Sequence, residues 1–85
     1  MKLNKTKERI QVVSLADMNV GEKGRVIFLN SPIQKRLFEL GLTEGSLVEC
    51  VLRPLFSDPA AYLIRGAVIA IRSRDCKNIM IEPVF

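Results

Sequence analysis

A series of short β-prone runs, separated by turn-forming residues, constrains the fold of this chain most. With 85 residues the chain is long enough for one hydrophobic core and no more. Short strands with turns at intervals of about ten residues are typical of a small antiparallel barrel. The sequence therefore predicts a mainly β fold, a small β-barrel with one short helix, whose closure would leave no exposed sheet edge. The predicted strands are residues 25–29, 47–53, 62–65, 68–72 and 79–82.

The pattern inside each run predicts how its strand is buried. Residues 25–29 are continuously apolar apart from Arg25, which predicts a strand buried for most of its length. Residues 47–53 alternate instead, which predicts a half-buried strand. Its inner face is predicted to carry Val48, Cys50 and Leu52, and its outer face Glu49 and Arg53.

Turn-forming residues separate the runs. Gly21 and Gly24 bracket a polar pair, which we interpret as a β-turn and not as a phosphate-binding loop. A tight turn is predicted at Gly66-Ala67, between two strands of a hairpin. Pro83 is predicted to end the last strand, because proline cannot donate to a ladder. Residues 73–78 are predicted to form a helical turn.

The clearest local signal is a short helix with both ends specified. Ser31 is a suitable N-cap, Pro32 suits the first helical position, and Gln34 completes a capping box. Gly41 is predicted to end the helix in the left-handed conformation, and Leu42 to fold back as the apolar contact after it. The apolar side chains at helical spacing are predicted to cover one barrel end, and they are Ile33, Leu37 and Leu40.

The residue types exclude most catalytic chemistry. The chain has no histidine, so the commonest general base and transition-metal ligand is missing. Cys50 and Cys76 lack CxxC spacing, and we interpret both as core residues, since a closed zinc site needs about four ligands. We therefore expect a binding module with no catalytic residue, no metal site and no cofactor. The small number of cysteines favours a reducing cytosol, and no signal peptide or membrane span is expected.

The formal net charge is +4, and part of it lies near the start of the chain. We expect residues 1–13 to form a basic lead-in, either a flexible tail or an edge strand, and residues 14–85 to form the domain. We interpret the basic residues of this lead-in as a solvated tail and not as a nucleic-acid-binding arm. Elsewhere in the chain the basic residues are interspersed with acidic ones, and no exposed aromatic side chains are expected on which bases could stack. The basic residues are Lys2, Lys5, Lys7 and Arg9.

Taken together, these residues resemble the FeoA family of small ferrous-iron-transport proteins. The resemblance extends from Ser14 to Val84 and depends on the order and spacing of several motifs. The motifs are residues 21–26 (GEKGRV), 36–45 (RLFELGLTEG), 58–59 (DP), 65–66 (RG), 69–72 (IAIR) and 79–81 (IMI).

The resemblance implies an SH3-like barrel. It also implies a cytosolic accessory role beside FeoB, a membrane protein that carries ferrous iron and bears a GTPase domain. We expect the contact with this partner to involve a proline-bounded loop, residues 54–59, which holds large apolar side chains. The expected contact residues are Leu55, Phe56 and Asp58, with Lys35 and Glu39 at the rim.

Three questions stay open at this point. A nucleic-acid-binding module and a direct transition-metal sensor are the alternative functions, the first through the basic lead-in and the second through scattered thiols and carboxylates. A homo-oligomer is a further option, because short barrel edges can pair. The direction of any effect on the transporter, activating or inhibitory, does not follow from the residues.

Overall fold

Six antiparallel strands form a single sheet in the computed structural model, which describes residues 11–55 and 58–84. The spatial order is β1-β6-β2-β3-β4-β5. Two short helices and one 3-10 turn connect the strands, so the predicted mainly β class with a short helix is confirmed. The elements are β1 (Val13–Ser14), η2 (Leu15–Asp17), β2 (Lys23–Leu29), α1 (Gln34–Glu39), β3 (Leu47–Leu52), β4 (Ala60–Ile64), β5 (Ala67–Ile71), α2 (Ser73–Cys76) and β6 (Ile79–Val84).

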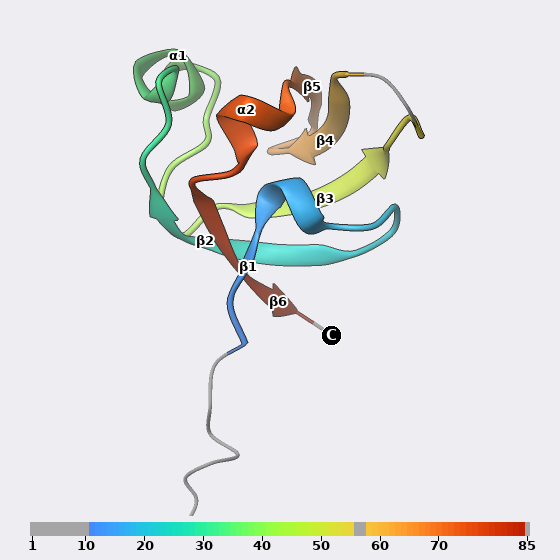
Figure 1. The fold of residues 1–85 in the computed structure, drawn as a ribbon. Coiled ribbons are helices and arrows are strands. Elements are labelled where there is room, and N and C mark those ends of the chain that lie inside the picture. The colour runs from blue at the N-terminus through green and yellow to red at the C-terminus, as the bar shows by residue number, and fades with distance from the viewer. Residues whose placement is uncertain (1–10, 56–57, 85) are drawn as a thin grey trace, which may run out of the picture.

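The sheet is strongly curled and wraps around the core (Figure 1). Among the described strands no ladder joins β1 to β5, so the expected closure of the barrel by hydrogen bonds is not found. β1 and β5 are therefore the two edges of the sheet.

Aliphatic side chains from most elements fill the space inside the curl. Tyr62 is the largest of them and is completely buried. The core also includes both cysteines, as predicted. The buried apolar residues are Leu15, Met18, Val26, Leu29, Leu37, Leu42, Val48, Cys50, Ala60, Tyr62, Ile64, Ile69, Ile71, Cys76, Ile79 and Ile81.

An irregularity in β2 changes which of its side chains reach the core. The pairing of β2 with β6 shifts between Val26 and Phe28. A bulge of this kind leaves one residue unpaired and bends the strand. Ile27 and Phe28 are consequently exposed, by 39% and 49%. The prediction that this strand is buried for most of its length is therefore wrong.

A second irregularity in β3 has a larger consequence. The pairing of β3 with β4 shifts between Cys50 and Leu52. Because alternation has a period of two, one extra residue exchanges the faces of everything after it. Leu52 is 57% exposed, whereas Arg53 is half-buried and hydrogen-bonded inside the domain. The prediction was right for Val48 and Cys50 and wrong for Leu52 and Arg53.

The helix α1 is confirmed, with its end better predicted than its beginning. Gly41 has φ of 100°, its N–H donates to Phe38 O, and Leu42 N donates to Leu37 O at 2.8 Å. These two bonds make a Schellman motif, and buried Leu42 packs in the same core as Leu37. However, Leu40 is 41% exposed, so it does not cover the core as predicted.

The N-terminus of α1 differs from the predicted capping box. The helix begins at Gln34, its N-cap is Ile33, and no side chain caps it. Ser31 is buried, and its Oγ accepts a hydrogen bond from Ile33 N at 3.2 Å. Ser31 O also accepts from Gln34 N. Ser31 therefore stabilises a turn before the helix, and Pro32 lies in that turn and not in the helix.

Three predicted turns and ends also shift. The β4–β5 hairpin turns at Arg65-Gly66, where both residues have positive φ (50° and 82°), and Ala67 already pairs with Ile64. Gly24 lies inside β2, where a Cβ would collide with the Ile81 side chain. Pro83 pairs with Gly24 within β6, and the strand continues to Val84.

The predicted helical turn after β5 is confirmed as α2. None of the helices in the described part of the chain has the length and apolar character needed to cross a membrane.

Candidate functional site

The expected contact loop follows β3 and is partly described. Leu55 is 87% exposed, more than any other large apolar side chain among the described residues. Asp58 is also exposed, and its Oδ1 accepts hydrogen bonds from Ser73 Oγ at 2.7 Å and Ser73 N at 3.2 Å. These bonds, mainly the one from the hydroxyl, lower the pKa of the Asp58 carboxyl. Phe56 lies outside the described residues.

The hydrogen bonds of Asp58 hold one end of this loop. They join Asp58, two residues before β4, to Ser73, the first residue of α2, which is distant in the sequence. Asp58 is therefore an ionised side chain with a fixed direction, and Leu55, three residues earlier in the chain, is an apolar side chain exposed to solvent. An exposed apolar residue on a loop is a common feature of docking surfaces.

The expected rim residues lie on α1. Lys35 and Glu39 are both exposed on this helix, and Phe38 between them is 66% exposed. A shallow hollow runs beside this helix, and it is lined by Leu29, Gln34, Lys35, Phe38, Thr43 and Glu44. Phe38 is thus a second exposed apolar side chain beside this hollow, which the helical pattern alone did not reveal.

The structure does not bring the loop and the predicted rim together. Figure 1 shows α1 and the β3–β4 loop at opposite ends of the molecule. β3 runs between them, because it begins after the α1–β3 connection and ends at the loop. Leu55 and Asp58 therefore belong to one surface, and Lys35 and Glu39 to another.

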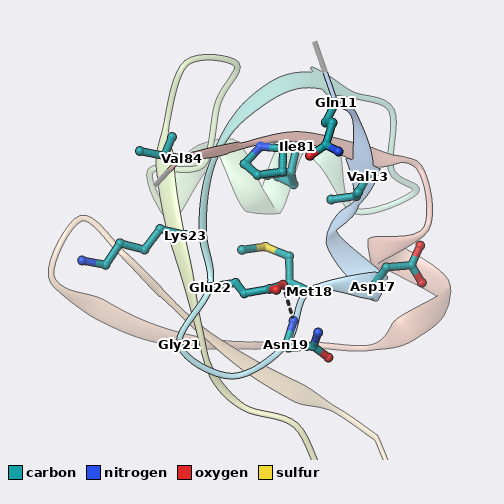
Figure 2. A pocket seen from close by; sticks show the side chains of 11 residues that line it. Gln11, Val13, Asp17, Met18, Asn19, Gly21, Glu22, Lys23, Ile81 and Val84 are labelled. Carbon is teal, nitrogen blue, oxygen red and sulfur yellow. Dashed lines mark hydrogen bonds between the residues drawn. The ribbon is translucent and has the colours of Figure 1, made fainter. Parts of the chain in front are cut away.

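A separate hollow of about 430 Å³ lies between η2, the start of β2 and the end of β6. Its floor is apolar, with Met18 at the centre of the view in Figure 2 and Ile81 above it. Glu22 points into it, and its carboxylate accepts a hydrogen bond from Asn19 N at 2.8 Å. Asp17 and Lys23 lie at its margin (Figure 2). The acidic groups are satisfied or solvated, so this hollow offers no reactive group.

A buried polar network lies at the end of β3. Arg53 Nε donates to Met18 O at 2.6 Å, and Arg53 Nη2 donates to Tyr62 Oη at 3.0 Å. Tyr62 Oη in turn donates to Leu15 O at 3.1 Å. Burial raises the pKa of the Tyr62 phenol well above its usual value. The network ties η2 to β3 and β4, and it is a structural feature rather than a site open to ligands.

Both thiols are buried and unreactive in this arrangement. Cys50 and Cys76 are free cysteines, and Cys76 Sγ contacts Tyr62 Oη at 3.7 Å. Burial is the main cause that raises the pKa of Cys76 to about 11, so it is a neutral thiol at ordinary pH. Within residues 11–55 and 58–84, no three His, Cys, Asp or Glu side chains lie close enough to hold a metal ion together.

The described surface offers exposed apolar side chains, which suit binding. The exposed apolar side chains stand on a rigid sheet and on the connections at its two ends. The polar groups that are strongly held, Arg53 and Tyr62, serve the fold. The basic residues near the start of the chain, on which a nucleic-acid function would depend, lie outside the described residues.

The chain matches the family model of the FeoA domain over residues 13–83. No curated protein matches it. Among solved structures, a crystal structure of an iron uptake regulatory protein (FeoA) is 25% identical with a TM-score of 0.76, covering 88% of this chain and 100% of that one.

Two further structures share the fold. A zinc complex of FeoA from Stenotrophomonas maltophilia, described as a procaryotic SH3 domain protein, is 21% identical with a TM-score of 0.72 and covers 82% of this chain and 89% of its own. A manganese-dependent transcriptional repressor is 15% identical with a TM-score of 0.80, covering 89% of this chain but only 44% of the repressor. The fold is thus SH3-like, as the resemblance implied. Since the FeoA model spans nearly the whole described region, the chain belongs to the FeoA family, a family of ferrous iron transport.

Proposed function

We propose that this chain is a cytosolic accessory protein that binds and modulates a FeoB-like membrane transporter of ferrous iron. The observation that carries the proposal is the FeoA domain match over residues 13–83, which leaves no room in the described region for a second functional unit. The family is one of small transport-associated proteins and not of known enzymes. Action through surface contacts is the function that such a domain supports.

The β3–β4 loop is the proposed main contact. It combines Leu55, Phe56 and Asp58, the apolar and acidic residues expected from the sequence. Burying an exposed leucine side chain contributes about 1.5–3 kcal/mol to association. Leu55 is 87% exposed, so nearly all of this contribution is available to a partner. Asp58 supplies a carboxylate whose direction Ser73 fixes.

Lys35 and Glu39 are proposed to form a separate, weaker contact. They lie on α1 at the other end of β3, so a partner would reach them with a different segment (Figure 1). Both are exposed charges, and exposed ion pairs contribute roughly 0–1 kcal/mol each. Their contribution is expected to be smaller than that of the loop.

Co-purification with the detergent-solubilised transporter tests the proposal. The wild-type chain is expected to remain bound, and Leu55→Asp is expected to weaken binding at least tenfold, which corresponds to about 1.4 kcal/mol. Val12→Asp is the matched control, because Val12 is an exposed valine that precedes β1 and is not part of the loop, and it is expected to bind like wild type. The rate of GTP hydrolysis, measured with and without the chain, reports modulation.

The outcomes separate the parts of the proposal. Absence of binding by the wild-type chain would reject the transporter as partner. Unchanged binding by a folded Leu55→Asp variant would remove the loop from the contact but keep the partner. Binding without any change in GTP hydrolysis or iron uptake would leave a docking protein that does not modulate.

A further inference from the structure

The two edges of the sheet are protected very differently. β1 is an edge of two residues, and so short a strand offers little backbone for pairing. β5 is an edge of five residues, Ala-Val-Ile-Ala-Ile, and its pairing with β4 continues without a register shift. It contains no charge and no proline. Natural sheets commonly protect such an edge with lysine, proline or a bulge.

The register shows which backbone groups of β5 face outward. Ile64 and Ala67 close a two-residue turn, so they form a hydrogen-bonded pair of the antiparallel ladder. Alternate residues of β5 therefore bond to β4, and the N–H and C=O of Val68 and Ala70 point to the free edge. Within the described residues, no other backbone group bonds to these two residues.

The solvent face next to this edge is also apolar. Val68 is 64% exposed and stands opposite Leu63, while Ala70 is exposed and stands opposite Ala61. Neither β4 nor β5 carries a charged residue. An antiparallel sheet usually presents polar residues to water on its outer face. Both the edge and the adjoining face thus favour an added apolar strand.

Positive charge flanks this apolar edge. Exposed Arg65 lies in the turn before β5, where its Nε donates to Gly41 O at 3.0 Å. Exposed Arg72 and Arg74 follow β5, and the acidic groups near Arg72 are exposed Asp58 and buried Asp75. An antiparallel second copy would place its Arg72 beside this Arg65, and each copy carries a net charge of +4. A partner with carboxylates at both ends of its strand is complementary instead.

We propose that the free edge of β5 accepts an extended, apolar segment of a partner protein, with acidic residues at both ends of that segment. The added strand pairs with the N–H and C=O groups of Val68 and Ala70 and covers Val68 on the outer face. The inference deepens the proposed docking function and rests on it for the existence of a larger partner. It assigns a surface different from the β3–β4 loop.

A synthetic peptide tests this surface without the transporter. The probe is a capped peptide of alternating valine and threonine with two aspartates at each end, and its control carries lysines in place of the aspartates. Chemical shifts and amide exchange are measured by NMR on the intact chain. The acidic peptide is expected to bind at least tenfold more tightly, to shift signals of β5, and to slow exchange of the Val68 and Ala70 amides at least tenfold.

A pair of variants isolates the edge hydrogen bonds. Ala70→Pro removes an N–H that the β4 ladder does not use, and it is expected to weaken peptide binding at least tenfold. Ala70→Thr keeps the N–H and suits a strand, so it is expected to bind within threefold of wild type. Amide hydrogen exchange of Val68 and Ala70 is measured on the wild-type chain, so the inference can be tested even if Ala70→Pro does not fold.

Three results would overturn the inference. They are shifts confined to other surfaces, equal affinity for the acidic and lysine peptides, and a concentration-dependent dimer that Ala70→Pro abolishes, which would assign the edge to a second copy. If the peptide binds and the transporter does not, the transporter is rejected as the partner, and the β5 edge is kept as a docking site for an extended segment. If the peptide does not bind and Ala70→Pro binds the transporter like wild type, the β5 edge is rejected as a docking site and the transporter is kept as the partner.

Discussion

Removal of the Tyr62 hydroxyl is expected to lower the free energy of unfolding by about 2 kcal/mol. Tyr62 is completely buried on β4, and its hydroxyl connects Arg53 at the end of β3 with Leu15 in η2. Tyr62→Phe keeps the ring and its packing. The change therefore isolates the hydrogen bonds from the apolar burial.

The magnitude follows from the two stronger bonds that are lost, because the third, from Cys76 Sγ at 3.7 Å, comes from a weak donor. The hydroxyl accepts from charged Arg53 at 3.0 Å and donates to Leu15 O at 3.1 Å. A bond to a charged group contributes about 1.5 kcal/mol or more and a neutral bond about 0.5–1.5 kcal/mol, so the lower ends of the two contributions give the expected loss of about 2 kcal/mol. Both partners of the hydroxyl keep another hydrogen bond in the variant. The Arg53 guanidinium still donates through Nε to Met18 O, and Leu15 O still accepts from Met18 N. The larger penalty for an unpaired buried group is thus avoided.

Urea unfolding followed by circular dichroism measures this effect. A loss of about 2 kcal/mol corresponds to a melting temperature lower by about 8–16 °C for a domain of this size. Arg53→Met completes a double-mutant cycle, and a coupling of about 1 kcal/mol with Tyr62→Phe is expected because the two side chains are in contact. Exposed Arg74→Met is the matched control and is expected to stay within about 0.5 kcal/mol.

Two results would refute this reasoning. A destabilisation by Tyr62→Phe below about 0.5 kcal/mol would show that the network contributes little beyond the packing of the ring. Strictly additive effects of Tyr62→Phe and Arg53→Met would show that the hydrogen bond between them is energetically irrelevant.

Two further predictions concern the core and its titration. Gly24→Ala is expected to destabilise the chain by about 1–3 kcal/mol in the same assay, because the new methyl would overlap buried Ile81; an unchanged midpoint would show that β2 and β6 can separate at this point. Stability is expected to fall as pH rises from 9 towards 11, because the Cys76 thiol keeps its proton in the folded state up to a pKa of about 11 but loses it near 9 when unfolded. Cys76→Ala is expected to remove the loss of stability between pH 9 and 10. A loss that begins above pH 10 is expected to remain, because the pKa of buried Tyr62 is also raised in the folded state. An equally steep fall in Cys76→Ala would exclude the thiol as the source.

The parts of the fold that local chemistry determines could be predicted from the sequence. The end of α1 is an example, since a glycine in the left-handed conformation and an apolar residue after it suffice for a Schellman motif. The approximate positions of five strands along the chain could also be predicted from their β-prone runs. The beginning of α1 was not predictable in the same way, because Ser31 is buried and bonds to the turn and not to the helix.

The bulges could not be predicted, because each results from pairing between distant segments. Nothing in residues 25–29 indicates that β6 skips Ile27, and nothing in residues 47–53 indicates that β4 skips a residue after Cys50. Arg53 follows the second bulge, and its alternation with Glu49 made it look like a solvent-facing residue. In the structure it is the centre of a buried network.

The same reasoning explains why the residues proposed for docking could be selected by type and not by location. An apolar loop residue such as Leu55 is recognisable because a loop lies on the surface whatever the topology. Whether α1 lies beside that loop depends on the length and direction of β3, which the residues of neither segment reveal. The free edge at β5 is more hidden still, because its five residues look like an ordinary core strand. Only the strand order shows that no described strand follows β5, and this order turns an ordinary apolar run into a free sheet edge.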